Sequence, residues 1–406
     1  MILKYIDSMR SLKSNYLRVN STRLISVFIV FSLFKSCIVP FTPESDEFEE
    51  LLVVEGLITD QHEVCTIKLS KSFPLWKAPE IKPTPLKGSK VWISDDFGQI
   101  HNLKETIAGT FITDSASFQG TIGRKYTLHI KTNDSFGNLN YESVPMEMKP
   151  VPKIDSIYYE KTVSTIWNQT VEGCNIYLDT YDPTNNCNFF RWKFSETWEF
   201  HLPNYAIDKI CWTTDYSNGI FIKNTSILSE DRVIRYPLIS ITNPNDKLSG
   251  KYSILVNQYS LNEDEYLYWE KLKKTSEQGG GLYDLIPTFI PNNINCIEDP
   301  SKKVLGYFSV SAVSSKRIFI KDTFSGLNDY TYYNCITDTL YRRGNLWLYD
   351  TISFPPTVAV EGSYWIITDN SDKKPPNRII TTKRECVFCS LRGANIKPAY
   401  WDDDNK

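Results

Sequence analysis

A long β-strand is encoded by FFRWKFSETWEFHL, residues 189–202, in which apolar and polar side chains alternate. Phe190, Trp192 and Phe194 recur at every second position, which is the period of one face of a sheet. Aromatic side chains also favour the pleated, half-buried surface of a sheet. The stretch therefore predicts a strand with one face in a hydrophobic core.

The segments around this strand have the composition of further strands. Each is short, rich in Val, Ile, Tyr and Phe, and bounded by turn residues. Together they predict a larger β-rich domain over residues 154–406. The candidates are SIYYEKTV (156–163), NIYLDTY (175–181), GIFIKN (219–224), RVIRYPLISI (232–241), KYSILVNQYSL (251–261) and VLGYFSVSAVSSKRIFIK (304–321), with tyrosine-rich strands over 322–385.

One segment of this domain, residues 263–278, has a helical pattern. Asn262 and Glu265 have the spacing of a capping box at its start. Apolar side chains then share one face, and the glycine run 279–281 ends the helix, since glycine adopts the left-handed cap conformation. We predict one amphipathic helix packed on a sheet.

Residues 51–149 form a separate unit of seven short runs with period-two alternation, which indicates an Ig-like β-sandwich. Pro150 and Pro152 mark its boundary, because proline breaks a strand ladder. Its layout resembles transthyretin-like and carboxypeptidase-regulatory-like modules, which act as spacers or adaptors. The stretches that carry this likeness are Val54-x-Gly56, GSKVWI (88–93) and Tyr126-x-Leu128-x-Ile130.

The first 36 residues have the pattern of a signal peptide: a basic leader followed by the apolar run Leu24–Phe34. As a helix this run would rise only ~17 Å, too short for a hydrocarbon core of ~30 Å. Residues 33–37, LFKSC, resemble a lipobox, so we predict cleavage before Cys37 and lipidation of this cysteine. An ordinary signal peptide followed by a stray cysteine is the alternative. Residues 37–50 are then an acidic tether.

Charge limits the partners of the cleaved chain. It keeps 39 basic and 47 acidic residues, because the leader removes six of 45 and one of 48, and its formal charge is −8. Nucleic acid is therefore excluded as a partner, since phosphate binding needs a basic surface.

Eight cysteines remain besides Cys37, and an even number in an exported chain indicates disulfides. Cys65 lies in an apparent strand and is expected to be buried and free. The pairing of the others stays open. The candidate disulfide cysteines are Cys174, Cys187, Cys211, Cys296, Cys335, Cys386 and Cys389.

The sequence lacks the motifs of several common catalytic sites. The sequence has no H-E-x-x-H, no G-x-S-x-G and no phosphate or dinucleotide loop, so we predict neither a metal site nor a cofactor. A glycosidase pair among Asp179, Glu196 and Glu199 is the enzymatic alternative, because these acids lie on aromatic strands. Solvated strand edges are the simpler place for them.

Several stretches together resemble one family, the Bacteroidota lipoproteins catalogued as domain of unknown function 4249. The resemblance covers nearly the whole chain after the leader. It implies a cell-envelope lipoprotein of two β-rich parts, often encoded beside TonB-dependent outer-membrane receptors, and it supplies no catalytic residues. The stretches are LLVVEGLITDQ (51–61), KPVPKIDSIYYE (149–160), ILVNQYSLNEDEYLYWEKLKK (254–274), VLGYFSVSAVSSKRIFI (304–320), Cys386-x-x-Cys389 and Lys397-Pro398-x-Tyr-Trp401.

We therefore expect a lipoprotein of the outer membrane that faces the outside and has no catalytic activity. Its partners would be the membrane, through the lipid anchor, a TonB-dependent receptor and a glycan or peptide ligand. The alternatives are a carbohydrate-active hydrolase on a β-sandwich and a structural or adhesive envelope protein.

Overall fold

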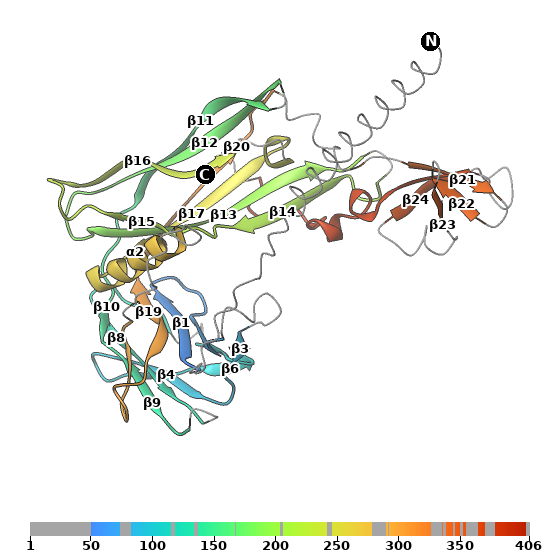
Figure 1. Ribbon diagram of the computed structural model, residues 1–406. Helices are drawn as coiled ribbons and strands as arrows, with labels where there is room; N and C mark the ends of the chain where they lie inside the picture. The colour runs from blue at the N-terminus through green and yellow to red at the C-terminus, as the bar shows by residue number, and fades with distance from the viewer. Residues whose placement is uncertain are drawn as a thin grey trace, which may run out of the picture. The chain divides into compact units, whose positions relative to one another are not determined.

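The computed structural model of the chain is drawn in Figure 1. The predicted leader, Cys37 and the tether up to residue 49 lie outside the described residues. The structure describes residues 50–73, 83–114, 118–133, 137–166, 168–203, 206–241, 246–277, 290, 292–325, 335, 338–343, 346–349, 352–354, 364–369 and 378–402.

Two sheets face each other to form the first sandwich. One has the strand order β19-β1-β2-β7-β6, with β3 paired to β2, and the other has the order β18-β9-β8-β4-β5, with β10 paired to β8. Side chains from both sheets share one hydrophobic core. The strands are β1 Leu52–Thr59, β2 Thr66–Lys71, β3 Thr84–Pro85, β4 Lys90–Asp95, β5 Ile100–Asn102, β6 Lys104–Ile107, β7 Thr110–Ile112, β8 Lys125–Lys131, β9 Asn140–Ser143, β10 Met146–Glu147, β18 Ile294–Cys296 and β19 Val304–Ser311.

Two strands of the first sandwich come from far along the chain. β18 pairs with β9, and β19 pairs in parallel with β1 over the whole length of both strands. The predicted range of the first sandwich, residues 51–149, does not contain these two strands, because both come after residue 154. Gly306 makes the β1–β19 approach possible, because it has φ +90° and a Cβ there would lie 1.9 Å from the carbonyl oxygen of Val54.

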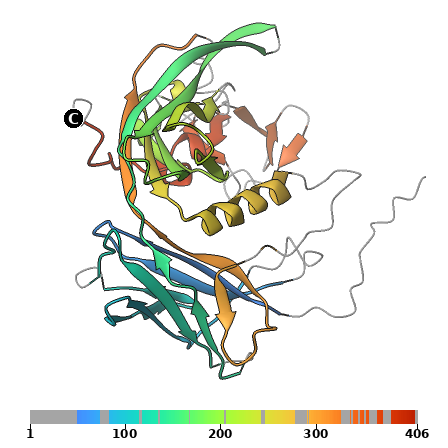
Figure 2. The same cartoon turned by 90° about the vertical axis from the view of Figure 1, so that its left-hand side faces the viewer.

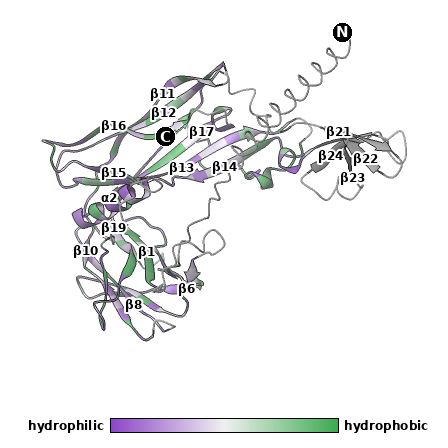
Figure 3. Cartoon of the chain, in the orientation of Figure 1, coloured by the Kyte–Doolittle hydropathy of each residue, from purple (hydrophilic) through white to green (hydrophobic). Residues whose placement is uncertain are grey.

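Two more sheets form the second sandwich. They have the orders β11-β12-β16 and β14-β13-β17-β20, with β15 paired to β13, and they share a second core that includes the fully buried Trp192. Figure 3 shows much of β1 and β17 as hydrophobic. The strands are β11 Ile154–Ile166, β12 Gln169–Asp182, β13 Phe189–His201, β14 Ile210–Tyr216, β15 Phe221–Asn224, β16 Asp231–Ile241, β17 Tyr252–Ser260 and β20 Val313–Ile320.

The helix α2, Glu263–Glu277, begins at the predicted residue and packs against both sandwiches. Tyr268, Trp269 and Leu272 contact the first core, whereas Tyr266 belongs to a small cluster with Phe189 of β13. Only Ala312 separates β19 from β20, so the chain crosses directly from one sandwich to the other (Figure 2). The helix and this crossing are the elements that position the site described below.

The C-terminal part adds a fifth sheet with the order β23-β22-β21-β25-β24, followed by short 3-10 turns. None of the described helices is long and apolar enough to cross a membrane. These remaining elements are β21 Asp338–Arg343, β22 Leu346–Tyr349, β23 Ile352–Phe354, β24 Tyr364–Asp369, β25 Arg378–Lys383, η4 Arg384–Cys386 and η5 Cys389–Leu391, with η2 Asp246–Leu248 before β17.

The prediction of a mainly β chain with an N-terminal sandwich, a second β-rich part and one amphipathic helix is confirmed. The predicted strand at 189–202 is β13, and its alternate aromatic side chains do face the core. The prediction of a capping box at Asn262 and Glu265 is wrong. The Asn262 side chain donates instead to the carbonyl of Glu147, and Glu265 points into the protein.

Candidate functional site

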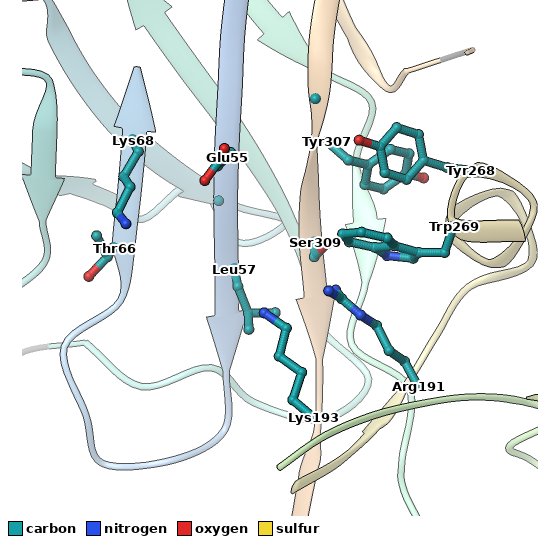
Figure 4. Close-up of a pocket in the computed structure, with 12 residues that line it drawn as sticks. Glu55, Leu57, Thr66, Lys68, Arg191, Lys193, Tyr268, Trp269, Tyr307 and Ser309 are labelled. Atoms are coloured by element: carbon teal, nitrogen blue, oxygen red, sulfur yellow. The ribbon is translucent and has the colours of Figure 1, made fainter. Parts of the chain in front are cut away.

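A cavity of about 220 Å³ lies where the first sandwich meets β13 and α2 (Figure 4). We call it the junction pocket. Its lining contains acidic and basic side chains, hydroxyl groups and aromatic rings. The lining residues are Glu55, Gly56, Leu57, Thr66, Lys68, Arg191, Lys193, Tyr268, Trp269, Gly306, Tyr307 and Ser309.

The floor of the junction pocket is the outer face of the sheet of β19, β1 and β2. Strand register aligns its side chains in two rows, because residues that pair across strands point to the same face. One row is Tyr307, Glu55 and Lys68, and the next is Ser309, Leu57 and Thr66. Between the rows, Phe308 of β19 belongs to the core of the first sandwich, and a Cβ on Gly56 of β1 would point toward the core residue Ile67.

The opposite wall is β13, which supplies two cations at adjacent outward positions. Arg191 and Lys193 lie two residues apart, so they share the face opposite the buried Trp192. Figure 4 shows both side chains extending toward β1 and β19. Their outward position follows from the aromatic alternation that places the other face of β13 in the core.

The helix α2 forms the third wall and fixes the orientation of Arg191. Its guanidinium lies 3.4 Å from the centre of the Trp269 ring, which is a cation–π contact. The Trp269 indole donates to Glu265 Oε1 at 3.2 Å, and the Tyr268 and Tyr307 rings lie 4.8 Å apart. The indole is therefore held from behind while its face supports the guanidinium.

Neither cation of β13 has an ion-pair or hydrogen-bond partner among the described residues. Desolvation lowers the pKa of Arg191 to about 10. The pKa of Lys193 falls to about 8 because desolvation and then the charge of Arg191 disfavour its ammonium form, even though the side chain keeps access to solvent. The charges of Glu55 and Glu265 oppose these shifts only in part, so the pocket keeps an excess of positive charge.

Glu265 lies behind the aromatic wall and is fully buried. Desolvation raises its pKa to about 7, against the opposing effects of Ser309, Arg191 and Trp269. Its Oε2 atom and the buried hydroxyl of Tyr307 have no hydrogen-bond partner within the described part of the chain. Glu265 does not line the pocket, but its charge acts on Arg191 and Lys193, and its carboxylate orients Trp269.

A second cavity, of about 570 Å³, lies along β13, β14 and β16 in the second sandwich, and we call it the strand groove. Lys247 Nζ lies 3.1 Å from Glu196 Oε1 and 3.5 Å from Asp215 Oδ2. The Tyr252 hydroxyl also donates to Glu196, at 2.8 Å. The lining residues are Phe194, Glu196, Thr214, Asp215, Tyr216, Ser217, Asn218, Phe221, Leu238, Ile239 and Lys247.

The acids of the predicted glycosidase alternative do not come together in one cavity. Only Glu196 lines the strand groove. Glu199 accepts from the Trp401 indole and is paired with His201, while Asp179 accepts from Ser156 and from the backbone of Arg235. Asp215, which sequence reasoning missed, is the second acid of the groove.

Four of the candidate disulfide cysteines are bonded. Cys211 joins Cys389, with their Cα atoms 5.6 Å apart, and Cys335 joins Cys386, with 5.4 Å between theirs. The two cysteines of the C-x-x-C motif therefore belong to different disulfides.

The prediction of disulfides is wrong for Cys174, Cys187 and Cys296, which are buried free thiols, as Cys65 is. They pack as small apolar residues in the two separate cores. Burial raises the pKa of Cys174 and of Cys187 to about 12, so both stay protonated and unreactive.

Sequence comparison places this fold in a known family. The profile of the family described as Domain of unknown function (DUF4249) matches residues 38–317. The chain belongs to the DUF4249 family. No curated protein matches it. The part shared with DUF4249 contains every residue of the junction pocket and of the strand groove, whereas the fifth sheet and both ends of the Cys335–Cys386 bond lie beyond it.

Proposed function

We propose that this DUF4249 protein is a non-catalytic lipoprotein of the outer membrane, anchored through Cys37 and facing the outside. It captures a small ligand as the accessory partner of a TonB-dependent transporter. The observation that carries the binding role is the junction pocket, where Arg191 and Lys193 have no ion-pair or hydrogen-bond partner among the described residues. The Arg191 guanidinium is largely withdrawn from solvent, and such a charge is unfavourable unless an anion or water is hydrogen-bonded to it.

The position of the pocket suits capture rather than chemistry. Its walls come from both sandwiches, so a bound ligand would contact β1, β13 and α2 at once. Glu265 has a pKa suited to proton transfer, but it lies behind Trp269 and does not line the pocket. We therefore assign the charged groups of the pocket to binding.

A crosslinked pull-down of the tagged protein from intact cells tests the proposal, with the Cys37→Ala variant as its comparison. Recovery of a TonB-dependent receptor with the wild type and its loss with the variant are the expected results. If the wild type recovers no envelope protein, the role as a transport partner is wrong.

The carbohydrate-active hydrolase is a second candidate, because Glu196 and Asp215 both line the strand groove. A glycosidase needs one acid to hold a proton and the other to be free, whereas Lys247 pairs with both. Turnover across a broad glycan panel that disappears in Glu196→Gln would favour this candidate over capture. A structural or adhesive role predicts neither turnover nor a soluble ligand.

A further inference from the structure

We propose that the junction pocket binds a small, hydroxylated monocarboxylate, with a hexuronic acid as the representative class. This inference rests on the proposed ligand-capturing function and names the chemistry of its ligand. Three features of the pocket support it: an oriented guanidinium, a limited excess of positive charge and hydroxyl partners on the floor.

The carboxylate is recognised by Arg191 together with Lys193. Stacking on Trp269 holds the guanidinium in one plane, and none of its N–H groups has an acceptor among the described residues. A planar guanidinium matches the two oxygens of a carboxylate, and such charge-assisted pairs are stronger than neutral hydrogen bonds. Lys193, two residues on and nearer the solvent, adds a second donor.

The charge balance of the pocket favours a single negative charge over two. Arg191, Lys193 and Lys68 supply the positive charge, while Glu55 stands in the same floor without an ion-pair partner among the described residues. A second acid, Glu265, lies behind the wall. A phosphate dianion would meet repulsion from these acids, whereas a carboxylate leaves the site close to neutral.

The rest of the ligand is defined by the floor and by the volume. Thr66 and Ser309 offer hydroxyl groups, Glu55 offers acceptor oxygens, and Lys68 offers donors, all on the same sheet face. These groups suit the hydroxyls of a sugar. The cavity of about 220 Å³ is smaller than the ~300–1,000 Å³ of drug-sized sites, so it takes one ring.

Calorimetric titration of the purified protein with D-glucuronate tests the proposal, with D-glucose, acetate and D-glucose 6-phosphate as comparison ligands. We expect glucuronate to bind at least about tenfold more tightly than each of the others. Glucose lacks the charge-assisted pair, which is worth about 1.5–3 kcal/mol, acetate lacks the hydroxyl groups, and the phosphate ester is repelled by the acids. Absence of glucuronate binding overturns the proposal. If glucose binds equally well, the pocket does not recognise the carboxylate. If acetate binds equally well, it does not recognise the hydroxyl groups. If the phosphate ester binds more tightly, the preference for a single negative charge is wrong.

Two variants locate the binding in this pocket. Arg191→Gln and Lys193→Gln should each weaken glucuronate binding at least about tenfold, because each removes a charged donor. Lys223→Gln is the matched control, since Lys223 is an exposed lysine of β15 outside the pocket. If Arg191→Gln does not fold, the solvent-accessible Lys193 still carries the test. Unchanged affinity in Lys193→Gln places the ligand elsewhere and overturns the assignment.

A third variant tests the charge argument. Glu55→Gln should tighten binding of glucose 6-phosphate about threefold, because it removes a repulsive carboxylate from the floor; no change would contradict the argument.

The outcome of the glucuronate titration is independent of the proposed transport role. If glucuronate fails but the receptor is recovered in the pull-down, only the ligand class is wrong; if glucuronate binds and no receptor is recovered, only the partnership is wrong.

Discussion

The junction pocket and the strand groove both contain basic and acidic side chains, but they treat charge in opposite ways. In the strand groove, Lys247 forms ion pairs with Glu196 and Asp215, and the Tyr252 hydroxyl donates a hydrogen bond to Glu196. In the junction pocket, Arg191 and Lys193 have no such partners within the described residues. Charge that is neutralised within the fold serves stability, whereas charge left unneutralised in a cavity is available to a ligand.

The largest effect is expected from a substitution that disrupts only the floor of the junction pocket. Gly306→Ala forces a side chain onto a residue with φ +90° and within 1.9 Å of the Val54 carbonyl, so β1 and β19 must separate. We expect a loss of about 3–5 kcal/mol in the free energy of unfolding, measured with urea.

Gly123→Ala is the matched control for this variant. Gly123 has φ +84°, but apart from its chain neighbours no atom of the described residues lies within 4 Å of the place that a Cβ would take there, so only backbone strain remains. The substitution should cost about 1–2 kcal/mol. Equal losses in the two variants would show that the close approach of β19 to β1 does not matter.

The next effect is confined to the side of the strand groove. The Cys211→Ala, Cys389→Ala double variant removes a bond that joins β14, which carries Asp215, to residues 178 positions later. It should cost about 2–4 kcal/mol in urea unfolding, because the unfolded chain loses its cross-link. Glucuronate affinity should stay unchanged; a parallel loss of affinity would mean that the two cavities are coupled.

A pH effect should belong to the junction pocket. The pKa of Glu265 is about 7 in the folded chain and about 4.3 when unfolded, so the unfolded chain holds fewer protons between these values. Stability should therefore fall by up to about 3 kcal/mol as the pH rises from about 4.5 to about 7, and then level off. Urea unfolding of Glu265→Gln, which cannot titrate, should lack this component. Identical pH profiles for the two proteins would contradict the raised pKa.

The smallest effect compares the two lysines directly. Lys247→Met leaves the buried Glu196 with one fewer partner and should cost about 2 kcal/mol of unfolding free energy. Lys193→Met removes a cation that has no protein partner among the described residues, so the change should stay within about 0.5 kcal/mol or be a gain. A clear loss in Lys193→Met would mean that the junction pocket is built for stability as well.

Local pattern predicted most of the elements but little of the site. The alternation at 189–202 and the helix at 263–278 depend on near neighbours, so both could be found in the sequence. The parallel pairing of β19 with β1 could not, because nothing local tells a strand which distant edge it will join. Without that pairing, the floor of the junction pocket cannot be located in the sequence.

The charged residues of the site were missed for a related reason. Arg191 and Lys193 lie on the polar face of a predicted strand, where charge is normally solvated, and Glu265 matched a capping pattern. A usable signal was present in β13, since Arg191 and Lys193 flank a core tryptophan there and the next position on their face is the uncharged Ser195. The position of α2 over that face decides the outcome, and it is a tertiary property.

The β1–β19 pairing also sets the order in which the molecule is able to fold. Leu52 can pair with Val304 of β19 only after that residue has been synthesised, which at about 5–20 residues per second takes roughly 10–50 s. Until then β1 presents an open strand edge, the kind of surface that draws in other chains. A chain cut after residue 149 keeps that edge permanently, so it should aggregate where the longer chain does not. High contact order thereby makes the first sandwich one of the last parts to be completed.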